Sequence, residues 1–127
     1  QERLDMKLYR ITEAGRAELQ RWLATPLPAQ DYREAVLIQV YFGGKLADEE
    51  LIRLLNREIQ SLEERLATYE AIYASNRALI HTVEDQRAFV LMVSTLEYGI
   101  LSNRVAVNWL KSVLERVRSG HYVLQNL

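Results

Sequence analysis

Side chains that commonly carry chemistry are sparse in this 127-residue sequence. There is no cysteine, so the chain has no thiol nucleophile, no thiolate metal ligand and no disulfide, a pattern usual in cytosolic proteins. The two histidines, His81 and His121, are far apart and lie near the ends of expected helices, so they do not form a pair of ligands on one helix face. We therefore expect no metal site and no cofactor.

The acidic and glycine-containing segments likewise match no catalytic pattern. Glu49–Glu50 and Glu63–Glu64 are adjacent pairs, which point in different directions on a helix and are typical of a solvated surface. The sequence has no GxGxxG, P-loop or GxSxG motif, and Gly43–Gly44 is typical of a turn. We therefore predict that the chain is not an enzyme.

Aromatic side chains are the remaining candidates for a ligand site. Tyr69, Tyr73, Tyr98 and Trp109 could line an effector pocket between helices, because such pockets are often rich in aromatic residues. Packing in a hydrophobic core explains the same residues and is the favoured interpretation.

Composition narrows the class of protein. Hydrophobic residues make up 49% and charged residues 26%, as in an ordinary globular domain. A formal net charge of -1 argues against strong nucleic-acid binding by these residues alone, because phosphate binding needs an excess of Lys and Arg. No apolar run reaches the ~18 residues that a membrane span needs. We expect a cytoplasmic protein without membrane contact.

The first third of the chain predicts short elements. The alternation in 6–11 is typical of a strand, and Thr12 can cap a helix that ends near Ala24, before the proline pair at 26 and 28. This break separates 1–25 from 26–127, which we expect to form a second, helical domain. Asp31 can cap a second helix that ends near Phe42, before Gly43–Gly44.

The rest of the chain predicts two long helices. The third begins near Asp48 and carries a heptad stripe, and the turn after it lies within 75–84. The fourth runs from about Asp85 to about Ser119, where Gly120 ends it. The stripe of the third helix is Ile52, Leu55, Ile59, Leu62, Leu66, Tyr69 and Tyr73. The fold class expected is therefore all-α: a long antiparallel helical hairpin, two shorter helices and a short N-terminal strand.

The fourth helix has more apolar surface than the other helices can cover. It carries one heptad row and an adjacent second row, and 89–101 is apolar nearly all round. We therefore expect a homodimer through this helix, with a monomeric four-helix bundle as the alternative. The expected interface residues are Phe89, Val93, Leu96, Ile100, Asn103, Val107, Leu110 and Leu114. The second row is Tyr98, Leu101, Val105 and Trp109. Asn103 either sets the register of the pair or faces water.

Several segments resemble a known family. Tyr9-Arg10-Ile11-Thr12-Glu13-Ala14-Gly15-Arg16, then Leu19 and Trp22-Leu23, is similar to the run that ends the winged helix-turn-helix of PadR-like transcriptional regulators. Arg33 to Ile38, Tyr41 to Gly43 and Trp109-Leu110 resemble the longer C-terminal domain of that family, also called the virulence-activator α type.

This resemblance implies a cytoplasmic bacterial regulator that dimerises through its C-terminal helices. It identifies 1–25 as the end of a wing strand with the helix that leaves the DNA-binding domain, whose body would precede Gln1, and 26–127 as the dimerisation domain. DNA would be bound only through that preceding domain, where Lys7 and Arg10 are candidate contacts to the phosphate backbone. Effectors in the family are varied, so a small-molecule effector is a further expectation.

Two other functions fit a small helical protein. An enzyme of the chorismate-mutase type is also a helical dimer, but its site needs several cations that converge on a dicarboxylate. Arg53, Arg57 and Arg65 do not recur on one inward face. A purely structural helical scaffold is the other alternative.

Overall fold

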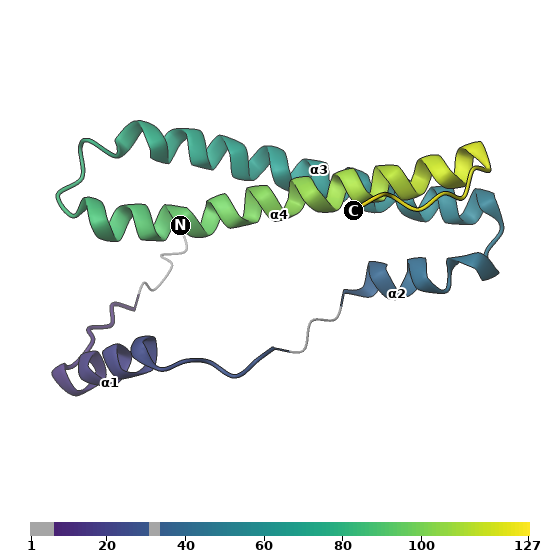
Figure 1. Cartoon of the computed structure of the whole chain (residues 1–127). Coiled ribbons are helices and arrows are strands. Elements are labelled where there is room, and N and C mark those ends of the chain that lie inside the picture. The colour runs from purple at the N-terminus through teal and green to yellow at the C-terminus, as the bar shows by residue number, and fades with distance from the viewer. Residues whose placement is uncertain (1–6, 31–33) are drawn as a thin grey trace, which may run out of the picture. The chain divides into compact units, whose positions relative to one another are not determined.

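The computed structural model describes residues 7–30 and 34–127, and all regular elements in these ranges are helices (Figure 1). In chain order they are α1 (Glu13–Ala24), α2 (Ala35–Tyr41), the short 3-10 helix η1 (Gly43–Lys45), α3 (Asp48–Leu79) and α4 (Gln86–Ser119). The chain divides into two compact units, 1–33 and 34–127. The expected all-α class with a long hairpin is confirmed.

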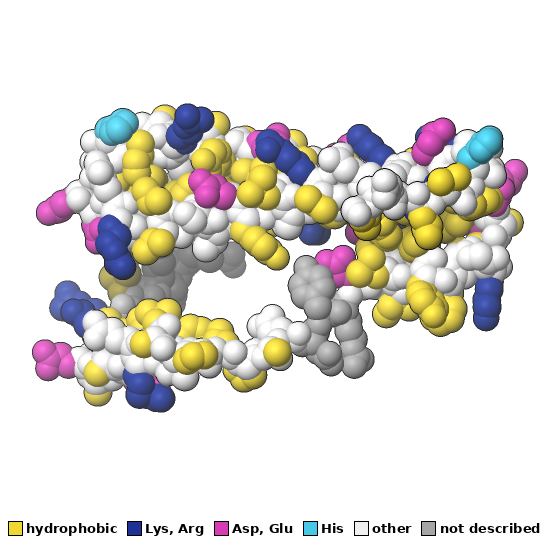
Figure 2. Space-filling model, in the orientation of Figure 1, with side chains coloured by type: hydrophobic (Ala, Val, Ile, Leu, Met, Phe, Trp, Pro, Cys, Tyr) yellow, Lys and Arg dark blue, Asp and Glu magenta, His cyan; other side chains and the backbone are white. Residues whose placement is uncertain are grey.

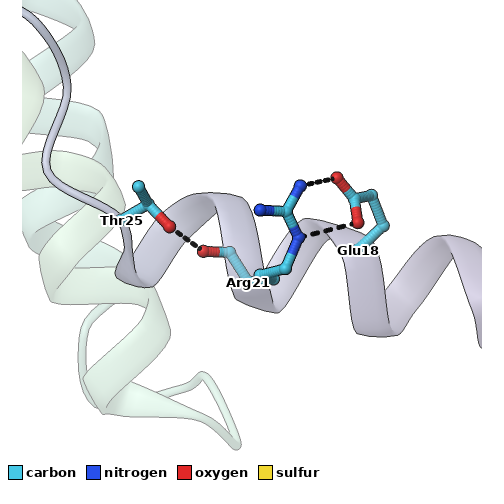
Figure 3. Close-up of polar contacts among 3 residues, drawn as sticks. All are labelled: Glu18, Arg21 and Thr25. Carbon is cyan, nitrogen blue, oxygen red and sulfur yellow. Dashed lines mark hydrogen bonds and ion pairs between the residues drawn. The ribbon is translucent and has the colours of Figure 1, made fainter.

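The unit 1–33 contains α1, which begins and ends as its sequence predicts. The hydroxyl of Thr12 accepts a hydrogen bond from the backbone N–H of Gly15 at 3.0 Å and so caps the first turn. Figure 3 shows the other end, where Thr25 Oγ1 donates to the carbonyl of Arg21 at 2.7 Å and the Arg21 guanidinium is paired with Glu18. This pairing lowers the pKa of Glu18 and raises that of Arg21, but both side chains are exposed, so it contributes little to stability.

The expected strand at 6–11 is not formed in the described part of the chain. Met6 lies outside the described residues, and 7–12 have no regular secondary structure. A strand is defined by hydrogen bonds to a neighbouring strand, and the described residues supply no such neighbour. The alternating residue types therefore predicted a strand, but a strand also needs a neighbouring strand.

The second helix is shorter than expected. Asp31, its predicted cap, lies outside the described residues, and α2 begins after Glu34, whose side chain makes no cap hydrogen bond. The helix ends before Gly43 as predicted, but for a different reason. Gly43 does not adopt a positive φ; it is buried, and a Cβ atom there would lie 3.2 Å from Cδ1 of Leu51. Close packing, and not a left-handed cap, accounts for this glycine.

The long hairpin of α3 and α4 is confirmed. Three acidic residues, 48 to 50, occupy the first turn of α3, where they favour the positive end of the helix dipole. Asp85 accepts a hydrogen bond from the N–H of Ala88 at 2.9 Å and starts α4. Gly120 ends α4 with φ of 71°, a left-handed conformation that favours glycine.

The core of the unit 34–127 lies between α3 and α4, at the end away from the turn. Leu55 and Leu110 are the most deeply buried side chains, at 0% and 1% exposure. Val36 and Val40 of α2 pack against this core, so α2 covers one side of the hairpin there. The core cluster is Leu51, Leu55, Ile59, Leu62, Val107, Leu110, Val113, Leu114 and Val117.

Candidate dimerisation surface

The predicted interface row of α4 faces α3 of the same chain. Four of its members, Ile100, Val107, Leu110 and Leu114, are buried in the single chain, and the last three belong to the core cluster. Phe89, Val93 and Leu96 are half-buried. This row therefore packs largely on α3 within the single chain, and its contact with a second chain stays a prediction. The longest heptad row is covered by the nearest long helix, and that helix is α3 of the same hairpin.

Asn103 bonds to its own helix in the single chain. Its side chain is half-buried, and Nδ2 donates to the carbonyl of Gly99 at 2.6 Å. This bond to its own helix satisfies the amide where water is partly excluded. The side chain is therefore not fully solvated, and a register contact between copies stays a prediction.

The opposite face of α4 is apolar and uncovered. Along it, steps of 3 and 4 residues connect Leu91, Ser94, Tyr98, Leu101 and Val105, and Val90 lies beside them. The exposed fractions of the apolar members run from 46% at Val90 to 70% at Val105. We call this set the outer α4 face. It includes three members of the second row noted in the sequence, and Figure 2 shows apolar side chains exposed along the hairpin toward its turn.

Charges are absent from this face because those of α4 pair with α3. Between residues 88 and 110 the only charged residues are Glu97 and Arg104. Arg104 donates to Glu70 at 2.6 Å, and the hydroxyl of Tyr73 donates to Glu97 at 3.0 Å. Lys111 forms the same kind of contact with Glu63 at 2.7 Å. All three contacts lie on one side of the hairpin, which we call the ion-pair side.

The pKa of Tyr73 is raised because its hydroxyl donates to Glu97, whose carboxylate also disfavours a second negative charge nearby. The hydroxyl therefore stays protonated through the neutral range and keeps the contact between α3 and α4. The group is exposed, so the contact orients the two helices more than it stabilises them.

The four aromatic residues predicted for an effector pocket do not converge within one chain. Tyr69 packs across Gly99, where a Cβ atom would lie 3.1 Å from Cε2 of the ring. Tyr73 lines a groove of about 460 Å³ on the ion-pair side, together with Arg104. Tyr98 belongs to the outer α4 face, and Trp109 packs against the core. Tyr69 and Tyr73 are one turn apart on the side of α3 that meets α4, whereas Tyr98 and Trp109 lie on another face of α4, three turns apart.

The other expected sites are placed as follows. Lys7 and Arg10 are exposed in the irregular segment before α1. In the described ranges, no three His, Cys, Asp or Glu residues gather as a metal ion would require. No helix within those ranges is long and apolar enough to cross a membrane. Arg53 and Arg57 line a shallow groove with acidic residues, and Arg65 is exposed elsewhere on α3.

Comparison with known proteins gives consistent relatives. The chain is 25% identical over 121 residues to the negative transcriptional regulator PadR of Bacillus subtilis. The aligned region covers 91% of this chain and 64% of that protein. It therefore spans slightly less than two thirds of this relative. The fold is similar to that of Bacillus subtilis PadR solved in complex with operator DNA, with a TM-score of 0.73 and 20% identity over 91% of this chain and 67% of that one.

The virulence activator AphA of Vibrio cholerae also has this fold, with a TM-score of 0.70 and 23% identity over 90% of this chain and 66% of that one. The family model described as "Virulence activator alpha C-term" matches residues 32–118, which include α2, α3 and nearly all of α4. The resemblance to PadR-like transcriptional regulators drawn from the sequence is thus confirmed, and the chain belongs to the virulence activator alpha C-terminal family.

Proposed function

We propose that residues 34–127 are the dimerisation domain of a cytoplasmic PadR-like transcriptional regulator, and that two copies pair through the outer α4 face. The observation that carries this proposal is the uncovered, uncharged row on α4, opposite to the face that packs on α3. Its apolar residues leave roughly 500 Å² of surface exposed on each copy, a patch of the size that is often functional. Pairing would hold two DNA-binding domains at a fixed spacing, as two half-sites in DNA require.

The spacing of the outer α4 face allows an antiparallel pair. Leu91 lies seven residues before Tyr98, and Val105 lies seven after it. A two-fold axis beside Tyr98 would therefore place Leu91 of one copy opposite Val105 of the other, layer by layer as in a coiled coil. Antiparallel order also brings opposite ends of the two helix dipoles together.

Disulfide cross-linking tests both the surface and the direction. The chain contains no cysteine, so each introduced thiol is the sole one. We expect a mixture of the Leu91→Cys and Val105→Cys chains to give a covalent heterodimer on oxidation, while Leu91→Cys alone gives little product. A strong product from Leu91→Cys alone would mean a parallel pair. No product from any combination, together with a monomeric mass by light scattering at high concentration, would refute pairing through this face.

We propose further that Lys7 and Arg10 contact the DNA backbone in the whole regulator. Both are exposed cations just before α1, and the related PadR was solved with operator DNA. Removing one phosphate contact lowers the slope of log K against log salt by about 1 without changing sequence preference. Titration of operator-length DNA with the whole gene product and its Lys7→Ala variant at several salt concentrations tests this. An unchanged slope would remove Lys7 from the interface.

A small-molecule effector forms no part of this proposal, because Tyr73 lines the groove on the ion-pair side without the other three predicted aromatic residues. An enzymatic function forms no part of it either, since the relatives found are named as transcriptional regulators and virulence activators.

A further inference from the structure

A small groove lies between α3 and α4 near the turn of the hairpin. It has a volume of about 120 Å³, and one copy of the chain supplies all the side chains that line it. Its floor is apolar, and its rim carries two opposite charges and a hydroxyl. The floor consists of Ile80, Phe89, Val90 and Val93, and the rim consists of Tyr73, Arg77 and Glu97. We call this set the turn groove. Only Val90 also belongs to the outer α4 face, so pairing through that face would leave most of the lining uncovered.

The apolar floor of the turn groove leaves side chains that a ligand could cover. Ile80, Phe89 and Val93 are only half-buried, and Val90 is 46% exposed. An apolar cavity of about 150 Å³ is large enough for a benzene ring. The turn groove is smaller, so it suits a branched aliphatic group better than an aromatic one.

The rim holds its two charges close to one hydroxyl. Tyr73 and Arg77 lie one turn apart on α3, and the Tyr73 hydroxyl donates to Glu97 of α4 at 3.0 Å. The pKa of Tyr73 is raised by this hydrogen bond and by the charge of Glu97, and the Arg77 cation opposes the rise. The described residues Arg77 and Glu97 nevertheless form no ion pair with each other. Their charged groups are therefore near neighbours that are too far apart to bond directly.

This arrangement matches a ligand with both charges better than an ion of one sign. A carboxylate that approached Arg77 would be repelled by Glu97, and an amine that approached Glu97 would be repelled by Arg77. The hydrogen bond from Tyr73 reaches one oxygen of the Glu97 carboxylate, so the other oxygen can accept from an ammonium group. An α-amino acid carries its carboxylate, its ammonium and its side chain on one carbon atom, and it can therefore meet both parts of the rim and the floor together.

We propose that the turn groove binds a free α-amino acid with a branched aliphatic side chain, such as leucine. The ligand carboxylate would accept hydrogen bonds from Arg77, the ammonium would donate to Glu97, and the side chain would pack on the apolar floor. The site does not depend on the proposed dimerisation, because its residues come from one copy. It uses only Tyr73 of the four aromatic residues expected from the sequence to line an effector pocket.

Titration of the whole chain with L-leucine tests the site, with the backbone amide signals followed by nuclear magnetic resonance. We expect the signals that move to concentrate within 73–80 and 89–97. Two analogues are matched controls: isocaproate lacks the ammonium group, and isoamylamine lacks the carboxylate. Each should bind about tenfold more weakly than leucine, because it loses one charged hydrogen bond and keeps one repulsion. An analogue that binds as tightly as leucine would overturn recognition of a zwitterion. Signals that do not move in these ranges at any soluble concentration of leucine would overturn the site.

Two variants separate the contributions of the rim charges. Arg77→Gln should weaken leucine binding about tenfold but strengthen isoamylamine binding, because it removes a repulsion. Glu97→Gln should likewise weaken leucine binding and strengthen isocaproate binding, while its amide oxygen can still accept from Tyr73. A merely structural loss would weaken every ligand in both variants, and that result would overturn the proposed contacts.

Arg87→Gln is the matched control variant. Arg87 is an exposed cation in the first turn of α4 and does not line the turn groove. It removes the same charge as Arg77→Gln, so the control should bind leucine like the parent chain. Circular dichroism checks that all three variants keep their helices. An equal loss of leucine binding in Arg77→Gln and Arg87→Gln would mean that net charge governs binding, and it would overturn the site.

Discussion

Replacing Leu101 with glutamate separates pairing from folding more sharply than other single changes. Leu101 is 59% exposed on the outer α4 face, at its border with Glu97 and Arg104. The substitution would leave the core between α3 and α4 intact, so the single chain should fold normally. In the dimer, each copy would place a carboxylate where an apolar side chain is expected to be buried.

The size of the effect follows from the exposed area. About 100 Å² of Leu101 surface remains to be covered, which at ~25 cal/mol per Å² is about 2.5 kcal/mol. Two-fold symmetry repeats the loss, so the dimer would lose about 5 kcal/mol. That corresponds to a dissociation constant between about a thousandfold and ten-thousandfold higher, and burial of the two carboxylates adds to it.

Sedimentation equilibrium over a wide concentration range measures this dissociation constant, and circular dichroism checks the helix content. Ala71→Glu is the matched control, since it adds the same charge to an exposed position of α3 that points away from α4. We expect the control to dimerise like the parent chain. If Leu101→Glu dimerises as tightly as the control while it is fully helical, the outer α4 face is not the pairing surface.

Three further predictions concern the hairpin itself, and thermal or urea unfolding of the monomeric chain measures each. Leu55→Ala should lower the free energy of unfolding by about 3 kcal/mol, because the side chain is fully buried at 0% exposure. Gly99→Ala should change the stability of the parent chain little, because a gain of about 1 kcal/mol in helix propensity is opposed by a tight contact with Tyr69. The same substitution should stabilise a chain that already carries Tyr69→Ala. Equal effects in the two chains would show that the contact is not strained. Because the pKa of Tyr73 is raised in the folded chain, its hydrogen bond to α4 stabilises the fold below the pKa of an unfolded tyrosine, and this stability is lost as pH rises through the folded pKa. The parent chain and Tyr73→Phe should therefore differ in stability at neutral pH and become equal in strong alkali. A difference in stability that persists in strong alkali would contradict this prediction.

The sequence was a good guide to the elements and a poor guide to which face of α4 meets which neighbour. Caps and breaks are local signals, so Thr12, Asp85 and Gly120 could be assigned from a few adjacent residues. Which of two apolar rows packs inside the chain depends on the position of α3, a long-range property. The row that contains Leu110 has stronger heptad spacing, which predicts a dimer contact, but in the single chain α3 packs on it.

One signal in the sequence could have distinguished the rows. Glu97 and Arg104 flank the inner row of α4, and they pair with Tyr73 and Glu70 of α3 across the hairpin. Complementary charges beside a seam predict its partner, as the flanking positions of a coiled coil do. The same two side chains directly precede Tyr98 and Val105 and so also border the outer α4 face, but their hydrogen-bond partners lie on α3.

The distribution of burial along the hairpin ties pairing to the stability of its turn half. No side chain within 63–79 of α3 or within 86–99 of α4 is buried, whereas the other half holds nearly the whole core. Helices without a buried stripe are marginal in water, so in a single chain the turn half should open locally far more often than the rest. The outer α4 face lies mainly in this half, so a second copy would supply the packing it lacks. Backbone amides within 63–79 should therefore exchange with deuterium quickly in dilute, monomeric protein and slowly in concentrated protein. Amides near Leu55 should stay protected at both concentrations. Equally slow exchange near the turn at every concentration would show that the single chain already holds this half together.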